Sequence, residues 1–263
     1  MKPLVVPDAH VALAHRLAEA SGAIIRRYFR QVVVIEDKED ASPVTIADRE
    51  AEQAMRRLIA EAAPDHGIIG EEFGRERGDA EWVWVLDPID GTQAFITGKP
   101  SFGTLIALAH GGRPVLGIID QPITGERWIG GLGRPTTLNG APVAVRGCAS
   151  LGAAYLYTTS PHLFPDPEKA AFGRLEAEVK LSRFGADCYA YALLATGFVD
   201  LVAECGLKVY DHAALVAVIE AAGGIVTDWA GAPLGLVSNV CVLAAGDRRC
   251  HDLARGILSG ALP

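Results

Sequence analysis

The sequence predicts a mixed α and β protein whose helices and strands pack in layers. Helical and strand-like segments alternate through both halves of the 263 residues. Half of the residues are hydrophobic and 21% are charged, which excludes a disordered chain. The length is about 1.8 times that of a typical domain, so we expect one large domain or two closely joined lobes.

The first half is predicted to contain two long helices and a series of strands. Apolar residues recur at helical spacing over residues 8–30 and 44–62, and Pro64 follows the second helix. Residues 82–86 are continuously apolar and β-prone, which predicts a buried strand that ends at Asp87. Further strands are expected at residues 32–35, 66–70, 103–109, 115–120, 126–129 and 142–145.

The second half is predicted to contain four helices and four strands. The Gly223-Gly224 pair ends one of these helices. The helices are expected at residues 167–179, 188–198, 212–222 and 248–258, and the strands at residues 154–157, 201–204, 225–227 and 240–244. We expect an N-terminal lobe, residues 1–147, and a C-terminal lobe, residues 148–263. The boundary lies near the glycine-containing stretch at residues 147–152.

The charge and hydropathy of the chain exclude several classes of partner. The formal net charge is −8, which argues against proteins that coat nucleic acid or bind membrane surfaces. Two uncharged stretches, residues 147–165 and 229–246, contain Pro, Gly and Asn residues that favour buried strands and turns over a membrane span. The apolar run at residues 4–6 is too short for a signal peptide, so we expect a cytoplasmic protein.

The cysteines suggest neither disulfides nor a thiolate metal site. They number five, at positions 148, 188, 205, 241 and 250, and none forms a C-x-x-C pair. We expect small buried thiols in a reducing compartment.

Paired carboxylates are the strongest chemical signal in the chain. Asp87 and Asp90 lie three residues apart directly after the buried strand. Like charges about 4 Å apart repel by ~4 kcal/mol at an effective dielectric constant near 20, so a cation is expected between them. Pro88 restricts the backbone so that the Ile89 carbonyl can serve as a further oxygen ligand. Oxygen-only ligation favours Mg²⁺ or Mn²⁺ over Zn²⁺.

The residues that follow this pair predict a place for a phosphate group. Gly91 allows a ligand to approach the backbone, and the amides of residues 91–93 would begin a short helix. Taken alone, the hexapeptide at residues 87–92 also fits an ordinary Asp-Gly turn in which Asp90 caps the backbone. The chain contains none of the motifs of dinucleotide enzymes, P-loop NTPases, serine hydrolases, zincins or aspartyl-phosphate phosphatases.

Four ordered motifs resemble those of the inositol monophosphatase superfamily, whose members are Mg²⁺-dependent, Li⁺-sensitive phosphatases. They are Ser42-Pro43-Val44-Thr45-x-x-Asp48, Gly70-Glu71-Glu72, residues 87–92 and Tyr210-Asp211. The resemblance covers most of residues 38–228. It implies the layered α/β/α/β/α fold of sugar phosphatases, with a metal site where the lobes meet.

The resemblance implies two metal positions and a water-activating pair. Glu71, Asp87 and the Ile89 carbonyl would hold the metal that activates the attacking water. The metal that steadies the leaving oxygen would be held by Asp87, Asp90 and Asp211. Asp48 with Thr92 would orient or deprotonate the water, and a third, weaker ion would lie beside Glu71. Asp211 is expected just before a helix, where capping alone is the alternative role.

Within the superfamily, the chain is most similar to the histidinol-phosphatase branch. This similarity rests on residues 102–108, 159–161 and 187–194. Inositol phosphatases typically have a small residue at the position of Asp187 and a Trp at that of Tyr210. Glu204 matches the family's glutamate that contacts a substrate hydroxyl. The predicted substrate-binding residues are Gly91, Thr92, Gly185, Asp187 and Glu204.

We expect Asp187 and Glu204 to form an acidic pocket for the cationic substrate histidinol phosphate. The alternative for Asp187 is that it caps the helix that follows. The expected reaction is hydrolysis of a phosphate monoester without a covalent phosphoenzyme, in histidine biosynthesis. Alternative substrates are inositol monophosphate, fructose bisphosphate and a 3′-phosphorylated nucleotide, and the least favoured alternative is a non-enzymatic metal-binding scaffold. A homodimer is usual among such relatives.

Overall fold

A computed structural model describes residues 5–32, 35–37, 43–237 and 240–261 and contains two large β-sheets that alternate with layers of helix. The α-helices are α1 (Asp8–Tyr28), α2 (Ile46–Ala62), α3 (Thr92–Ile96), α4 (Asp166–Glu178), α5 (Asp187–Ala195), α6 (Val209–Ala221) and α7 (Arg248–Leu258). Short 3₁₀ helices are η1 (Leu151–Ala153), η2 (Pro161–Leu163) and η3 (Ser259–Ala261). Ser42 of the first motif and residues 33–34 of the first predicted strand lie outside the described residues.

The larger sheet has eight strands. They are β3 (Gly67–Gly70), β4 (Gly74–Glu76), β5 (Trp82–Asp90), β6 (Gly103–His110), β7 (Arg113–Gln121), β8 (Glu126–Gly131), β9 (Arg134–Leu138) and β10 (Ala141–Pro142). Their order is β10-β9-β8-β7-β6-β5-β3-β4, and all neighbours are antiparallel except β3 and β5. The parallel pair brings the ends of β3 and β5 to the same edge, which places the residue after Gly70 beside Asp87.

The smaller sheet has five strands. They are β11 (Tyr155–Thr158), β12 (Leu181–Phe184), β13 (Leu201–Leu207), β14 (Ile225–Asp228) and β15 (Val240–Ala245), in the order β12-β11-β13-β15-β14. A separate two-stranded ribbon joins β1 (Ile35–Asp37) to β2 (Pro43–Thr45). The predicted lobe boundary near residue 147 falls between the last strand of the larger sheet and the first strand of the smaller one.

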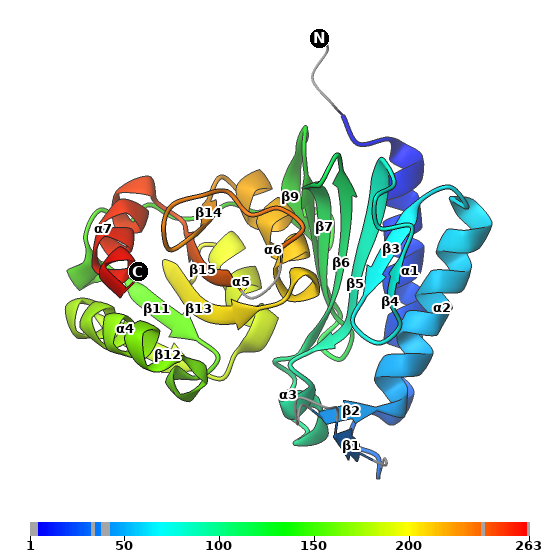
Figure 1. Cartoon of the computed structure of the whole chain (residues 1–263), viewed down its shortest axis with the longest axis horizontal. Helices are drawn as coiled ribbons and strands as arrows, with labels where there is room; N and C mark the ends of the chain where they lie inside the picture. The colour runs from blue at the N-terminus through cyan, green and yellow to red at the C-terminus, as the bar shows by residue number, and fades with distance from the viewer. Residues whose placement is uncertain (1–4, 33–34, 38–42, 238–239, 262–263) are drawn as a thin grey trace.

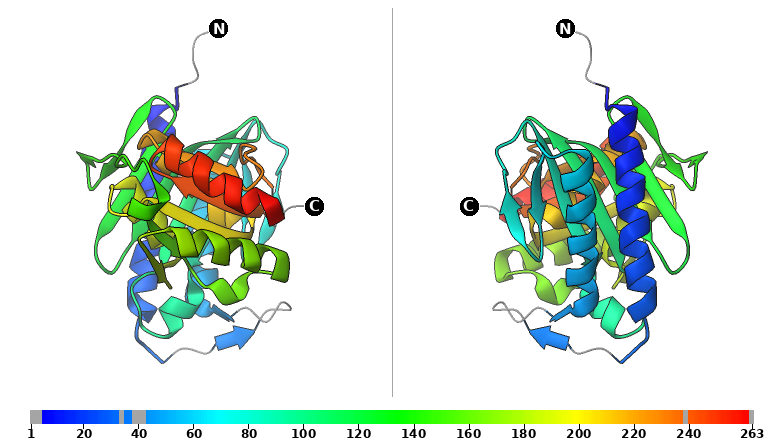
Figure 2. Two further views of the ribbon diagram at one scale, coloured as in Figure 1. Left: turned by 90° about the vertical axis from the view of Figure 1, so that its left-hand side faces the viewer. Right: turned by 90° about the vertical axis from the view of Figure 1, so that its right-hand side faces the viewer.

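The helices form three layers around the two sheets. Helices α1 and α2 lie side by side on the outer face of the larger sheet, and α4 and α7 cover the outer face of the smaller sheet (Figures 1 and 2). Helices α5 and α6 lie between the sheets (Figure 1). This order confirms the predicted α/β/α/β/α arrangement.

Each space between two layers is filled by apolar side chains. Met55 and Trp84 pack between α2 and the larger sheet, and Phe172 and Leu243 pack on the outer side of the smaller sheet. Helix α6 is largely apolar because it is covered on opposite faces, and nine of its 13 residues are buried. The central helical layer therefore fixes the two sheets relative to each other, and with them the residues at their junction.

Several predicted element ends are wrong. Strand β5 does not end at Asp87 but continues to Asp90, with its pairing to β6 interrupted between these two residues. Helix α6 begins at Val209, three residues before the predicted start. The predicted strand at residues 142–145 is reduced to Ala141–Pro142. Strands β4, β9 and β12 were not predicted because they are short and contain few buried residues, so they carry little apolar periodicity.

The prediction of five unpaired thiols is wrong for one pair. Cys205 on β13 and Cys241 on β15 form a disulfide, because the antiparallel register brings the two strands together at these positions. Cys148, Cys188 and Cys250 are free and buried, as predicted. Within the described ranges, none of the helices is both long and apolar enough to cross a membrane.

Candidate active site

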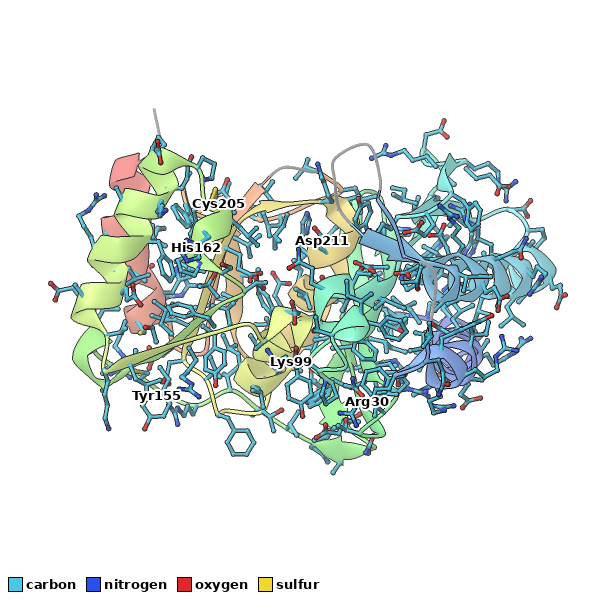
Figure 3. The ribbon with its side chains drawn as sticks, turned by 90° about the horizontal axis from the view of Figure 1, so that it is seen from below. Arg30, Lys99, Tyr155, His162, Cys205 and Asp211 are labelled. Carbon is cyan, nitrogen blue, oxygen red and sulfur yellow. A yellow bond between two sulfur atoms is a disulfide. The ribbon has the colours of Figure 1, made fainter. Side chains whose placement is uncertain are left out.

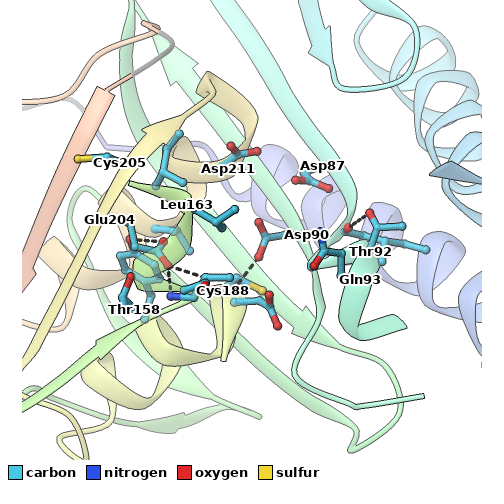
Figure 4. A pocket seen from close by; sticks show the side chains of 18 of the residues that line it. Asp87, Asp90, Thr92, Gln93, Thr158, Leu163, Cys188, Glu204, Cys205 and Asp211 are labelled. Carbon is cyan, nitrogen blue, oxygen red and sulfur yellow. Dashed lines mark hydrogen bonds between the residues drawn. The ribbon is translucent and has the colours of Figure 1, made fainter. Parts of the chain in front are cut away.

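Three carboxylates from two separate elements meet at the junction between the sheets. Asp87 and Asp90 come from β5, and Asp211 comes from the first turn of α6. One oxygen of each lies within 4.8 Å of the others (Figure 4). Asp211 lies near the middle of the molecule (Figure 3). We refer to Asp87, Asp90 and Asp211 as the metal end of the site.

Glu71 joins the metal end through the parallel pairing of β3 and β5. The Glu71 backbone N–H donates to the Leu86 carbonyl at 3.1 Å, which continues the pairing one residue past β3. Glu71 is also hydrogen-bonded to Asp87. The sequence therefore correctly groups Glu71 with the aspartates of β5.

Negative charge dominates the metal end, although the Lys208 ammonium opposes part of the rise in the pKa of Asp211. Burial raises the pKa of Asp87 well above its usual range, and Glu71, Asp90 and Asp211 raise it further. The Asp87 Oδ1 atom is buried and has no hydrogen-bond partner within the described residues. Burial also raises the pKa of Asp211 to about 7, although the Lys208 amide opposes this shift. A buried, oxygen-only donor set with an unpartnered carboxylate oxygen fits a hard divalent cation.

The position of Asp211 corrects one prediction. Asp211 is the third residue of α6 instead of the residue before it. Its Oδ2 accepts the Lys208 backbone N–H at 2.7 Å, so it satisfies the helix end from inside the first turn. The Asp211 side chain therefore both caps α6 and belongs to the metal end.

Asp48 and Thr92 have separate partners. Asp48 Oδ2 accepts the Thr45 backbone N–H at 2.9 Å and the Thr45 hydroxyl at 2.6 Å, as part of a capping box at the start of α2. Thr92 donates its hydroxyl to the Ile89 carbonyl at 3.2 Å. Burial raises the pKa of Asp48 to about 6, and Glu71 adds to the shift while Thr45 opposes it. Asp48 Oδ1 is buried without a hydrogen-bond partner among the described residues.

A pocket of about 300 Å³ opens at the metal end. The predicted site residues that line it are Glu71, Asp87, Ile89, Asp90, Gly91, Thr92, Asp187, Glu204 and Asp211. Asp48 and Gly185 are not part of this lining. The Gly185 N–H donates to the carbonyls of Thr158 and Thr159, at 3.2 and 2.9 Å. Gly185 is therefore bonded to the backbone of two residues that line the pocket.

Asp187 also lines the pocket and lies close enough to Asp90 to raise the pKa of that carboxyl group. It is the first residue of α5, with φ of 48°, and its Oδ2 accepts the Ser101 hydroxyl at 2.7 Å. The alternative in which Asp187 caps α5 is wrong, because the N–H of Cys188 in the first turn donates to Asp90 Oδ2 at 2.7 Å and not to Asp187. Gly91 packs against Asp187 so closely that a Cβ atom there would lie 2.7 Å from the Asp187 Cγ. Burial raises the pKa of Asp187, and Ser101 and Lys99 oppose the shift.

Glu204 lies beside Asp187 and is almost completely buried. One of its oxygens accepts the backbone N–H and the hydroxyl of Thr159, at 2.7 and 2.5 Å, and the other accepts the Tyr191 hydroxyl at 2.9 Å. Burial raises the pKa of Glu204, and these hydrogen bonds oppose the shift. We refer to Asp187 and Glu204 as the alcohol end of the site.

Several residues in and around the pocket were not predicted as site residues from the sequence. Ser101, Thr159 and Tyr191 fix the two carboxylates of the alcohol end, and their roles depend on contacts across the fold. Leu163, at the end of η2, adds an apolar contact on the same side. No local spacing in the sequence identifies such contacts, because they join separate elements.

Comparison with known proteins assigns the family. A sequence model of the inositol monophosphatase family matches residues 8–259. The chain belongs to the inositol monophosphatase family. Its match to that family covers both sheets and every carboxylate of the site, so the chain is a phosphatase of this family.

Several members of the inositol monophosphatase family are similar over most of the chain. "Bifunctional phosphatase IMPL2, chloroplastic" of Arabidopsis thaliana is 54% identical, over 94% of this chain and 74% of that protein. A histidinol-phosphatase of Chlorobaculum parvum is 35% identical, over 86% of this chain and 88% of that protein. The solved structure of an inositol monophosphatase from Zymomonas mobilis is 48% identical, with a TM-score of 0.90 over 97% of this chain and 100% of that chain.

Proposed function

We propose that this phosphatase hydrolyses histidinol phosphate to histidinol and phosphate, a step of histidine biosynthesis. The observation that carries the proposal is the charge of the pocket. Six carboxylates line it, and no Lys, Arg or His is among its described lining residues. The carboxylates are Glu71, Asp87, Asp90, Asp187, Glu204 and Asp211.

The excess of negative charge favours a phosphate ester whose alcohol portion carries a positive charge. Two divalent cations would balance four of the six carboxylates, and a bound phosphate dianion would add two further negative charges. The ammonium group of histidinol would offset part of this excess at the alcohol end, beside Asp187 and Glu204. A neutral polyol such as inositol would leave it uncompensated.

The relatives support both this substrate and one alternative. Proteins named histidinol-phosphatase, from Chlorobaculum parvum and Streptomyces coelicolor, are 35% and 33% identical to this chain. The inositol monophosphatase of Zymomonas mobilis, at 48% identity, makes inositol monophosphate the second candidate. The two acidic side chains of the alcohol end favour the cationic substrate of the two.

The carboxylates of the metal end would hold two Mg²⁺ ions, with Mn²⁺ as the alternative. Such ions lower the pKa of water and neutralise charge on a phosphoryl group. Glu71, Asp87 and the Ile89 carbonyl would form one ligand set, and Asp87, Asp90 and Asp211 the other. Asp48 Oδ1 is an unpartnered acceptor near Glu71, which suits it to take a proton from the attacking water at neutral pH. Glu204 and Asp187 would orient the alcohol group of the ester.

A substrate panel tests the proposal. Phosphate release would be measured with Mg²⁺ from histidinol phosphate, inositol monophosphate, fructose bisphosphate and adenosine 3′,5′-bisphosphate. We expect the highest kcat/KM for histidinol phosphate. Equal values across the panel would contradict the assignment and indicate a generalist enzyme.

Asp187→Ala tests the role of charge at the alcohol end. We expect kcat/KM to fall about 10- to 100-fold for histidinol phosphate, because a charge-assisted contact contributes about 1.5–3 kcal/mol. For inositol monophosphate we expect kcat/KM to fall by no more than about threefold, because a neutral polyol loses no charge-assisted contact. Asp166→Ala is a matched control, because Asp166 is also the first residue of a helix but does not line the pocket. Equal losses for both substrates would reject charge pairing.

Two further predictions concern the protein in the cell. We propose that it is a homodimer and that it acts in the cytoplasm, although the Arabidopsis relative is named as chloroplastic. Sedimentation of the purified protein tests the first, and fluorescence microscopy of a tagged chain in its own cells tests the second.

A further inference from the structure

Glu52 is a charged residue that is fully buried outside the pocket. It lies on α2, and one of its carboxylate oxygens accepts the Glu72 backbone N–H at 2.7 Å. The other accepts the Phe73 backbone N–H at 3.2 Å and the Arg56 Nε–H at 2.7 Å. The two amides follow Glu71 directly, so this carboxylate is bonded to the backbone that carries a proposed metal ligand.

The turn that contains Glu71 has little core packing of its own. All three residues of β4 are exposed, and Phe73 is 49% exposed. Arg56 donates from Nη2 to the Gly74 carbonyl at 2.5 Å, so it holds the far side of the same turn. Because apolar burial contributes little here, the turn is held by its backbone bonds to β4 and Leu86 and by the side chains of Glu52 and Arg56.

Gly70 shows how closely Glu52 approaches this backbone. A Cβ atom on Gly70 would lie 1.9 Å from Glu52 Oε1 and 2.8 Å from Arg56 Nη2. The glycine before Glu71 is therefore required by the buried carboxylate. Glu52 contacts the backbone on both sides of Glu71, at Gly70 and at the amides of the next two residues.

We infer that Glu52 is a positioning residue, which acts through the turn to hold Glu71 in place for a divalent cation. Fixing the turn in the folded protein removes an ordering cost that cation binding would otherwise carry. Replacing a residue that orients a metal ligand without binding the metal typically lowers metal affinity or activity about 10- to 100-fold. The inference rests on the metal site of the proposed function and is independent of which phosphate ester is the substrate.

Glu52→Gln tests this role. Gln keeps the size of the side chain and one carbonyl acceptor, but it removes the charge and the second acceptor oxygen. Titration of the metal-stripped full-length protein with Mn²⁺, followed by calorimetry, would give the dissociation constant directly. We expect about 10- to 100-fold weaker Mn²⁺ binding, with an unchanged far-UV circular dichroism spectrum. At saturating Mn²⁺, the KM for histidinol phosphate should remain within about twofold of wild type, because on this model Glu52 acts only through the metal site.

Two further variants separate positioning from stability. Ile59→Val truncates a buried residue of the same helix without contacting the turn, so it should lower the Tm and leave Mn²⁺ affinity unchanged. Arg56→Lys removes the bond to Gly74 and should weaken Mn²⁺ binding by several-fold, which provides a second test if Glu52→Gln does not fold.

The outcomes are distinguishable. Wild-type affinity in Glu52→Gln, or equal weakening in Ile59→Val, would overturn this inference and leave the metal site intact. A wild-type protein that binds no Mn²⁺ would overturn the metal site and this inference together. Mn²⁺ binding without hydrolysis of histidinol phosphate would reject the proposed substrate, while the comparison of the variants would still decide the role of Glu52.

Discussion

The two ends of the pocket carry the same chemical groups but stabilise them differently. At the metal end, burial and three neighbouring carboxylates all raise the pKa of Asp87, and one of its oxygens has no partner within the described residues. At the alcohol end, burial also raises the pKa of Glu204, but hydrogen bonds from Thr159 and Tyr191 oppose it. Asp187 is similarly supported by Ser101 and Lys99.

This difference indicates separate tasks for the two ends. The carboxylates of the metal end repel one another. Although Asp90 and Asp211 each accept a backbone N–H, one oxygen of Asp87 has no partner among the described residues, so a bound cation would complete this end. The carboxylates of the alcohol end accept hydrogen bonds from side chains of the protein, so on the proposed function they would contact a substrate without first binding a metal. Substitutions should therefore affect the two ends in different ways.

The largest expected effect follows from Asp87→Asn at the metal end. We expect kcat to fall by about 10³-fold or more, because bound cations contribute several kcal/mol to phosphoryl transfer and each 1.36 kcal/mol is tenfold in rate. The same substitution should raise the Tm of the metal-free protein by about 2–4 °C, because removing about 1 kcal/mol of repulsion shifts Tm by this amount. Phosphate release and thermal unfolding in EDTA are the measurements.

Asp79→Asn is the control for this substitution. Asp79 is exposed and lies outside the pocket, so both turnover and Tm should match those of the wild type. Retained turnover in Asp87→Asn would refute the metal assignment. A lower Tm in EDTA would show that Asp87 is stabilising without a cation, contrary to the comparison of the two ends.

Addition of Mg²⁺ should give the next largest effect. A ligand at 100 times its dissociation constant stabilises the folded state by about 2.7 kcal/mol, which corresponds to a rise in Tm of roughly 5–10 °C for a chain of this size. We expect the same rise in Asp187→Ala and a much smaller one in Asp87→Asn. Thermal unfolding of the three proteins with and without Mg²⁺ tests this. A reduced rise in Asp187→Ala would show that the ends are not separate.

The sequence predicts the central parts of the fold better than its edges. Strands β5, β6 and β7 lie inside the larger sheet, and their continuous apolar runs were predicted with small errors at the ends. Strands β4 and β12 lie at sheet edges and are mostly exposed. Because backbone pairing and not apolar burial holds these edge strands, their composition carries no comparable signal.

In the candidate site, too, local motifs were predicted and contacts between distant residues were not. Glu71, Asp87, Asp90 and Asp211 stand in motifs that the sequence displays, and the structure brings them together. The groups that hold site residues in place are distant in sequence. Ser101 is 86 residues from Asp187, Thr159 is 45 from Glu204 and Glu52 is 20 from Glu72. Their partners depend on how the sheets and helices pack, which no local pattern records. The Cys205–Cys241 disulfide, 36 residues apart, was missed for the same reason.

The smallest expected effect comes from Tyr191→Phe at the alcohol end. The substitution removes the hydroxyl that donates to Glu204 at 2.9 Å, but the two bonds from Thr159 remain. We expect a loss of about 1 kcal/mol, seen as a fall in Tm of about 2–4 °C.

The dissociation constant for Mn²⁺ should stay unchanged in Tyr191→Phe, because Tyr191 bonds only to a carboxylate that the protein already satisfies. Weaker Mn²⁺ binding in this variant would mean that Glu204 helps to shape the metal end, and the pocket would then act as one charged network. An unchanged Mn²⁺ affinity together with a lower Tm would show that the Tyr191 hydrogen bond stabilises the alcohol end without any bound ligand and does not affect the metal end.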